Sequence, residues 1–145
     1  CQHRHGQTYF VRGTAKYQAR QYQDAIADYD RAIAINPQHA NAYVGRGTAK
    51  YGLGKYQAAI PDHYRAIEID PEYATAYNNR GLAKYSLGQN QAAINDYDRA
   101  IEIDPQAADP YNNRGTAKFK LGEYQAAIND YDRAIELNPK IMEDS

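Results

Sequence analysis

Carboxylates, cationic side chains and a few histidines are the residues of this 145-residue chain that could carry out chemistry. Asp-Tyr-Asp triplets at positions 28–30, 96–98 and 130–132 offer pairs of oxygen ligands for a metal ion. Residues two apart on a helix do not share a face, so the two carboxylates of one triplet cannot bind the same ion. We interpret the triplets as architecture and expect no metal and no other cofactor.

A cationic pair recurs along the chain, an arginine followed four residues later by a lysine on the same helical face. The pairs are Arg12–Lys16, Arg46–Lys50, Arg80–Lys84 and Arg114–Lys118. One interpretation is an anion-binding stripe. The alternative, favoured by the formal net charge of -1, pairs these cations across a helix interface with Asp28, Asp62, Asp96 and Asp130.

The amino-terminal segment contains Cys1, His3 and His5, all of which can bind metal ions. A short segment without a second ligand cluster predicts no site. A chain that starts with cysteine is also compatible with a lipoprotein anchored through Cys1. We expect a cytoplasmic location, with lipid anchoring as the alternative.

Catalysis has no support in the residues. The one cysteine is terminal, the histidines are scattered, and no glycine-rich phosphate loop is present. The near-neutral charge argues against nucleic acid as a partner, because phosphate binding needs a cationic excess. No apolar run is long enough to predict a transmembrane segment.

The elements that position these residues follow from a period of 34 residues. Equivalent positions hold Pro37, Pro71, Pro105 and Pro139, and likewise Gly13, Gly47, Gly81 and Gly115. Such a period indicates stacked supersecondary units. The units are 6–39, 40–73, 74–107 and 108–141, with a flexible amino-terminal tail at 1–5 and a carboxyl-terminal tail at 142–145.

Each unit is predicted to be a helical hairpin. In the third unit, Tyr77, Gly81 and Tyr85 share one face of a first helix, and Gly88 ends that helix in a left-handed conformation. Apolar residues at three- and four-residue spacing continue to Ile103, and Pro105 ends the second helix. Small residues at the shared face allow the two helices to approach closely.

The pattern YNNRGxAKYxLGxYQAAIxDYDRAIEIDP resembles the tetratricopeptide repeat, abbreviated TPR, of the kind found in bacteria, and the resemblance covers residues 6–141. It implies an all-α fold, a right-handed α-solenoid of four repeats and eight helices. It also implies a concave groove, lined by the first helix of each repeat, that binds a partner peptide or helix.

The positions that match this groove predict a protein-binding site. They are Phe10, Thr14, Tyr17, Val44, Thr48, Tyr51, Asn78, Asn79, Leu82, Tyr85, Asn112, Asn113, Thr116 and Phe119. The site is apolar towards the amino terminus and rich in amides towards the carboxyl terminus, where side-chain amides can pair with an extended peptide backbone. The alternative is that these are solvated repeat residues without a ligand.

A carboxylate clamp for heat-shock-protein tails is not expected. The family's clamp positions hold Phe10, Thr14, Gly45, Thr75 and Asn79, or in the next frame Val44, Thr48, Asn79, Asp109 and Asn113. None of them is a cation.

Four positions depart from the repeat, one of them Asn90, which replaces the tyrosine seen at Tyr22, Tyr56 and Tyr124. Arg20 replaces the glycine of the turn between helices, Pro61 lies early in a second helix and should bend it or delay its start, and His63 replaces a buried tyrosine. We interpret His63 as a packed neutral histidine rather than a pH switch.

The carboxyl-terminal repeat has no polar helix after it to cover Ile128, Tyr131 and Ile135, which should be partly exposed. The chain is then either a segment of a longer protein or a homo-oligomer that assembles through its repeat ends. A self-assembling structural array is therefore the alternative to a protein-interaction scaffold.

Overall fold

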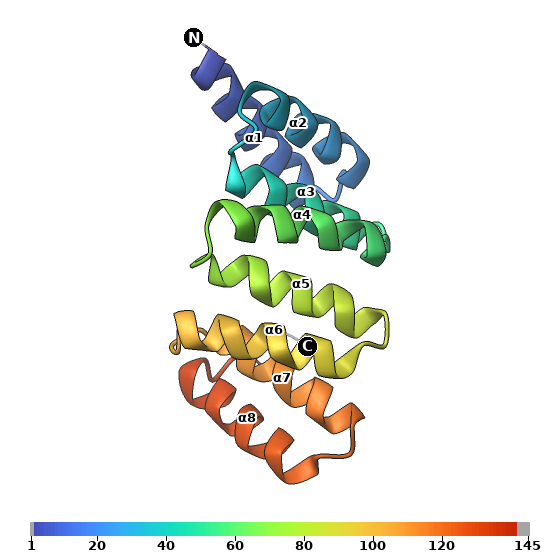
Figure 1. Ribbon diagram of the computed structural model, residues 1–145, viewed down its shortest axis with the longest axis vertical. Coiled ribbons are helices and arrows are strands. Elements are labelled where there is room, and N and C mark those ends of the chain that lie inside the picture. The colour runs from blue at the N-terminus through green and yellow to red at the C-terminus, as the bar shows by residue number, and fades with distance from the viewer. Residues whose placement is uncertain (1, 142–145) are drawn as a thin grey trace. The chain divides into compact units, whose positions relative to one another are not determined.

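Eight helices account for most of residues 2–141, the part of the chain that the computed structural model describes. Each is separated from the next by a short turn (Figure 1). They are α1 (Gln2–Gln18), α2 (Tyr22–Ile35), α3 (Ala40–Gly52), α4 (Tyr56–Ile69), α5 (Ala74–Ser86), α6 (Asn90–Ile103), α7 (Ala108–Lys120) and α8 (Tyr124–Leu137). The all-α fold of sequential helical hairpins is confirmed.

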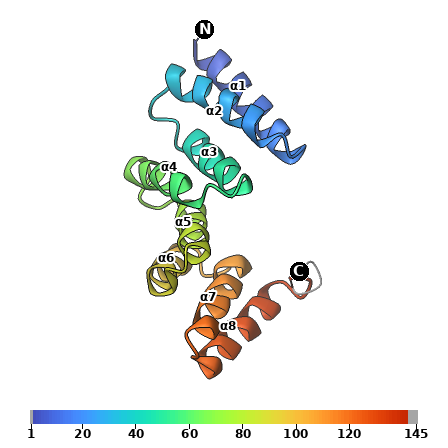
Figure 2. The same cartoon turned by 90° about the vertical axis from the view of Figure 1, so that its right-hand side faces the viewer.

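The chain divides into two compact units, Cys1–Glu72 and Tyr73–Ser145, which we call the N-terminal and C-terminal units. In the N-terminal unit α1 pairs with α2 and α3 with α4, while α2 also packs on α3. The C-terminal unit repeats this arrangement with α5 to α8 (Figure 2). In each unit two hairpins are therefore joined through the second helix of one and the first helix of the next.

Close approach within a hairpin depends on the recurring glycine. A Cβ atom added at Gly81 of α5 would lie 2.6 Å from the Tyr97 ring of α6, too close for any other residue. The Tyr97 ring fills the space and is fully buried, and Ala93 belongs to the same buried cluster. The predicted combination of small residues and buried tyrosine is confirmed.

The turns between the helices of a hairpin explain how each first helix ends. Gly54, Gly88 and Gly122 have φ near 80°. Around Gly54, its N–H donates to the Tyr51 carbonyl and the Lys55 N–H donates to the Lys50 carbonyl, which is the Schellman pattern. The first hairpin makes the same bonds with Arg20, at φ 63°, in the place of the glycine.

The structure departs from expectation at Pro61. α4 begins at Tyr56, the repeat position at which α2 and α8 also begin, so the expected delay of the helix is wrong. Proline removes its own backbone donor and its ring crowds the carbonyl four residues earlier, but the first turn of α4 is already closed before Pro61 by the bond from the Ala59 N–H to the Lys55 carbonyl. His63, in the same helix, is buried as predicted, with an exposed fraction of 1%.

The amino-terminal end of the chain also differs from its prediction. α1 begins at Gln2, so residues 2–5, expected in a flexible tail, are helical, since no residue between Gln2 and Gly6 stops a helix. Cys1, the candidate lipid anchor, and the tail at 142–145 lie outside the described residues. None of the described helices has the length and apolar character that a bilayer span requires.

Arg20 gives a prediction about stability. We expect Arg20→Gly to stabilise the chain by about 1 kcal/mol, because a residue with a Cβ is strained in the left-handed region and glycine is not. The unfolding midpoint in guanidinium chloride measures the change. The matched control is Gly54→Arg, which places the same side chain at φ 79° and should destabilise by a similar amount. A lower midpoint for Arg20→Gly would contradict this account.

Candidate functional site

A buried aspartate joins the two helices of every hairpin. In α2, the carboxylate of Asp28 forms ion pairs with Nη2 of Arg12 at 2.7 Å and with Nζ of Lys16 at 3.1 Å, and both cations belong to α1. The same pair of contacts recurs at Asp62, Asp96 and Asp130, each 4–5% exposed, with Arg–Asp distances of 2.7 Å and Lys–Asp distances of 3.0 Å. The interpretation of the cationic pairs as a helix-packing device is confirmed.

The arginine of this cluster also links neighbouring hairpins within a unit. Nη1 of Arg46 in α3 bonds Asp30 of α2 at 2.9 Å, and Nη1 of Arg114 in α7 bonds Asp98 of α6 at 2.9 Å. In the triplets at 28–30 and 96–98, the two carboxylates thus pair with different helices. Within residues 2–141 no three His, Cys, Asp or Glu side chains come together in a way that would hold a metal ion.

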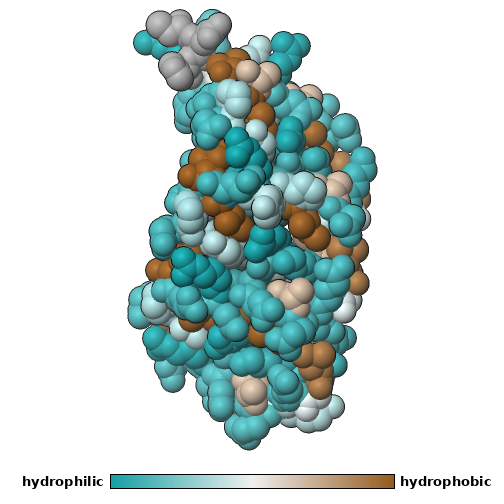
Figure 3. Space-filling view, in the orientation of Figure 1, coloured by the Kyte–Doolittle hydropathy of each residue, from teal (hydrophilic) through white to brown (hydrophobic). Residues whose placement is uncertain are grey.

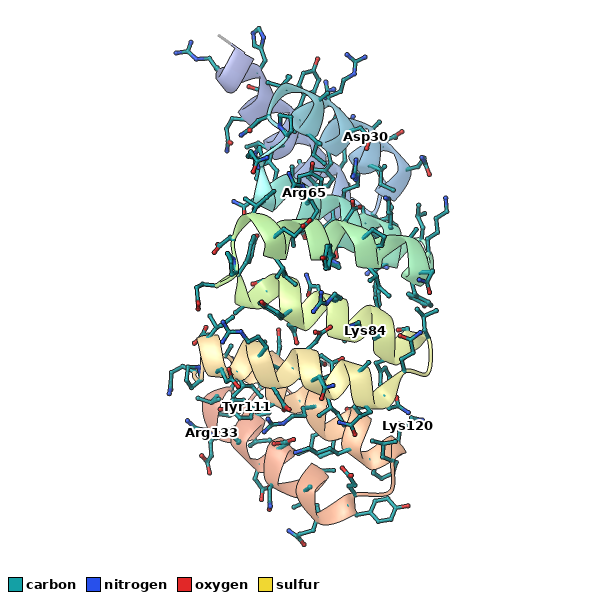
Figure 4. All side chains as sticks on the ribbon, viewed as in Figure 1. Asp30, Arg65, Lys84, Tyr111, Lys120 and Arg133 are labelled. Atoms are coloured by element: carbon teal, nitrogen blue, oxygen red, sulfur yellow. The ribbon has the colours of Figure 1, made fainter. Side chains whose placement is uncertain are left out.

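A tyrosine stacks between two arginines in each hairpin, a contact that the sequence analysis did not identify. Tyr111 of α7 has the guanidinium carbons of Arg114 and Arg133 at 5.6 and 5.9 Å from its ring centroid. Figure 4 shows Tyr111 and Arg133 next to each other. Tyr9, Tyr43 and Tyr77 are placed in the same way. The recurring Tyr-x-x-Arg spacing is the signal for this cation–π contact.

The predicted aromatic positions of the groove are engaged inside their own hairpins. Ring centroids lie 5.5 Å apart in the Tyr17–Tyr22 pair and 4.9 Å apart in the Tyr51–Tyr56 pair. Burial, together with the Tyr22 neighbour, raises the pKa of Tyr17 above its ordinary value. These tyrosines therefore stabilise the tip of the hairpin where the first helix ends and the second begins.

Phe119 is different because it is more exposed. It makes the same contact with Tyr124, at 5.4 Å, but retains an exposed fraction of 53%.

The N-terminal part of the predicted site is largely internal packing. The Phe10 ring lies 4.9 Å from the His39 ring and 5.9 Å from Tyr29, and Val44 is 7% exposed. The hydroxyl of Thr14 shares a hydrogen bond of 3.0 Å with Tyr29, and that of Thr48 donates to the Val44 carbonyl. These residues position α1 and α3, and they leave little polar surface for a ligand.

His39 caps the amino-terminal end of α3, a role that was not predicted because histidine is not a usual cap residue. Its Nδ1 accepts a hydrogen bond from the Ala42 N–H at the start of α3, at 3.2 Å. Burial lowers the pKa of His39, which keeps the ring neutral and able to accept.

The amides of the C-terminal unit form the most polar part of the predicted site. Nδ2 of Asn113 in α7 donates to Oδ1 of Asn78 in α5 at 3.0 Å. Asn78, Asn79, Asn112 and Asn113 are all half-buried, and the side chain of Asn112 makes no hydrogen bond with the rest of the described chain. The structure thus brings the amides of Asn78 and Asn113 together on neighbouring first helices.

Three further predicted residues pack within the C-terminal unit. Leu82 and Tyr85 of α5 pack against the core cluster that contains Tyr97. The Thr116 hydroxyl of α7 donates to the Asn112 carbonyl and contacts the Tyr131 hydroxyl at 2.8 Å. The C-terminal unit therefore presents polar groups on a packed base.

On the face seen in Figure 3, hydrophilic side chains dominate and apolar ones lie in small separate areas.

Comparison with known families identifies the repeat. Two profiles described as "Tetratricopeptide repeat" match residues 10–74 and 108–141, and one described as "TPR repeat" matches residues 81–122. The chain is a tetratricopeptide repeat protein, as the spacing predicted. This is a family of generally non-catalytic scaffolds that typically mediate protein–protein interaction. None of the curated protein sequences compared with the chain matches it.

Solved structures agree in fold. A crystal structure of MamA is 28% identical, with a TM-score of 0.84 over 95% of this chain and 81% of that one. The second TPR domain of human RPAP3, in complex with the HSP70 peptide SGPTIEEVD, is 26% identical, with a TM-score of 0.78 over 81% of this chain and 98% of that one. The first TPR of Spaghetti (RPAP3), bound to the HSP90 peptide SRMEEVD, is 23% identical, with a TM-score of 0.80 over 83% and 95%, and shows the fold alone.

The buried aspartate gives a prediction about stability. We expect Asp130→Asn to destabilise the chain by about 2 kcal/mol, because it weakens charge-assisted bonds from Arg114 and Lys118 at a buried position. The midpoint of chemical unfolding at pH 7 measures this. Asp132→Asn is the matched control, an exposed carboxylate on the same helix, and should leave the midpoint unchanged. Equal effects of the two substitutions would contradict the assignment.

The same contact predicts how stability depends on pH. Burial raises the pKa of Asp130, but the bonds from Arg114 and Lys118 together lower it by more than burial raises it. The pKa of Asp130 in the folded chain therefore lies below the ordinary 3.8. The carboxylate therefore stabilises the fold above pH 3.8, and this stabilisation is lost as the pH falls through the lowered value. The stability difference between the chain and Asp130→Asn should shrink in acid, and a constant difference down to low pH would contradict this.

Proposed function

We propose that this chain is a protein-interaction module whose C-terminal unit binds an extended segment of a partner through the amides of α5 and α7. The observation that carries the proposal is the hydrogen bond between Asn113 and Asn78, which orients two amides on adjacent first helices. No catalytic step is assigned to the chain.

The chemistry of the amides suits a peptide backbone. An asparagine side chain both donates and accepts, so it can pair with the N–H and the C=O of an extended chain. Because Asn113 is already held by Asn78, less side-chain freedom is lost on binding than with an unrestrained amide. Asn112 lies beside them with its amide unbonded within the described chain, and Phe119 adds exposed aromatic surface.

The pairing of cations in the C-terminal unit favours a ligand segment that carries little net charge where it meets the amides. Four of the five cations of the first helices in this unit, Arg80, Lys84, Arg114 and Lys118, bond aspartates of the second helices, and the fifth, Lys120, lies at the end of α7. Figure 4 labels Lys84 on α5 and Lys120 near the end of α7; Lys120 is exposed. Recognition through backbone-directed amides predicts modest affinity and loose dependence on ligand sequence.

The relatives solved with heat-shock peptides provide a test of this charge argument. We expect the peptides SRMEEVD and SGPTIEEVD, which RPAP3 domains bind, to show no saturable binding to this chain, because the clamp positions of the family hold no cation here. Fluorescence anisotropy with labelled peptides measures this, with an RPAP3 domain as positive control. Binding in the range of that control would contradict the expectation.

The amide site itself is tested by selection. Random peptides displayed on phage are first selected for binding to the chain. Their affinity should fall by roughly tenfold or more when Asn112→Ala and Asn113→Ala are introduced together, because the loss of one or two hydrogen bonds corresponds to such a factor. The matched control is Asn129→Ala, an exposed asparagine of α8. Peptides that bind the double variant and the parent equally would place the binding surface elsewhere.

A further inference from the structure

One face of α1 is exposed although the equivalent faces of other first helices are covered. Ala15 of α1 is exposed, whereas Ala49 of α3 and Ala117 of α7, at the same repeat position, are 0% exposed. A shallow depression of about 410 Å³ lies over this face. Its lining residues are Arg4, Gln7, Thr8, Val11, Arg12 and Ala15.

The C-terminal unit shows what covers this face in a complete interface. Ala117 of α7 belongs to one buried cluster with Ile94 and Tyr97 of α6. At its edge, Arg114 uses Nε and Nη2 to hold Asp130 of its own hairpin and Nη1 to bond Asp98 of α6. Apolar contact and an ion pair therefore act together where a second helix meets the next first helix.

The N-terminal unit repeats this interface. Ala49 of α3 clusters with Ile26 and Tyr29 of α2, and Nη1 of Arg46 bonds Asp30. Two independent examples thus define the same combination of an alanine, an isoleucine–tyrosine pair and a bridging arginine.

α8 carries the surface that such an interface needs, and it is exposed. Residues 125–136 of α8 are identical to residues 91–102 of α6, QAAINDYDRAIE. Ile94 is 6% exposed in α6, but its equivalent Ile128 is 49% exposed in α8. Asp132, the equivalent of Asp98, is also exposed and makes no ion pair with any residue of the described chain.

α1 carries the complementary group. Arg12 holds Asp28 with Nε and Nη2, as the other arginines hold their aspartates, while its Nη1 makes no such bond within residues 2–141. Its side chain is 57% exposed, against 22% for Arg46 and 19% for Arg114. Val11 of α1 occupies the repeat position that Asn113 occupies in α7. The α6–α7 contact accommodates an asparagine there, so a valine of similar size fits the same contact on α1.

We infer that α8 of one copy of this chain packs on α1 of a second copy and continues the interface seen within each unit. Ile128 and Tyr131 cover Val11 and Ala15, and Asp132 bonds Nη1 of Arg12. Such contacts join unlike faces, so they produce head-to-tail filaments or rings rather than two-fold symmetric dimers. One helix on another is a small interface, so association is weak, with a dissociation constant on the order of micromolar to millimolar. The inference goes beyond peptide binding because it uses a different face.

The experiment blocks one face at a time. Ala15→Arg obstructs only the α1 face and Ile128→Arg only the α8 face, and both positions are exposed, so each variant should keep its helicity by circular dichroism. Sedimentation velocity over a concentration series up to about 1 mM, which spans the expected weak affinity, measures the mass. We expect the parent chain to grow beyond a dimer, each variant alone to remain monomeric, and their equimolar mixture to stop at a heterodimer.

The mixture distinguishes this mode from any other. Ala15→Arg retains a working α8 face and Ile128→Arg a working α1 face, so only a head-to-tail contact allows one copy of each to combine. A parent chain that stays monomeric throughout the series overturns the inference, and would leave these faces to a partner other than a second copy. Undiminished association of either single variant, or a mixture that stays monomeric, also overturns it.

Discussion

The buried aspartate of each second helix is the interaction on which this structure depends. A carboxylate that is almost removed from water destabilises a fold unless it is paired, and here an arginine and a lysine one turn apart supply the pairing from the first helix. The two cations can reach one carboxylate only if the helices keep a fixed register. The arginine then extends a third bond to the preceding hairpin within a unit, so the same contact determines both pairing and stacking.

The fold could be predicted from the sequence because its causes are local and repeated. The 34-residue period, the glycine opposite a buried tyrosine and the cation–aspartate spacing all act within one hairpin or between adjacent ones. Two predictions were wrong because each considered a single residue or segment without the residues next to it. Pro61 did not delay α4, because the first turn of that helix is closed before the proline. Residues 2–5 are helical because nothing before Gly6 stops a helix.

The candidate site could be predicted only in part. Sequence position shows which residues share the first-helix face, but it does not show how much of each side chain is used inside the hairpin. Tyr17 and Tyr51 pack on tyrosines of their own hairpins, and Phe10 packs on His39, so the expected apolar half is mainly internal. The Asn78–Asn113 bond joins residues 35 positions apart, a contact that depends on how two hairpins stack. The unequal exposure of Ile94 and Ile128, whose neighbouring sequences are identical, likewise follows from tertiary context alone.

The central claim is that paired, buried carboxylates hold the hairpins in register, and a titration of individual carboxyl groups tests it most directly. Bonding to Arg12 is the main reason that the pKa of Asp28 is lowered, and the cations of α7 lower that of Asp130 against the effect of burial. Carbon-13 NMR of the aspartate carboxyl carbons, followed as a function of pH, reports each group separately. The account predicts midpoints for Asp28 and Asp130 below the ordinary value of 3.8, while the chain remains folded. Midpoints at or above 3.8 in the folded chain would contradict it.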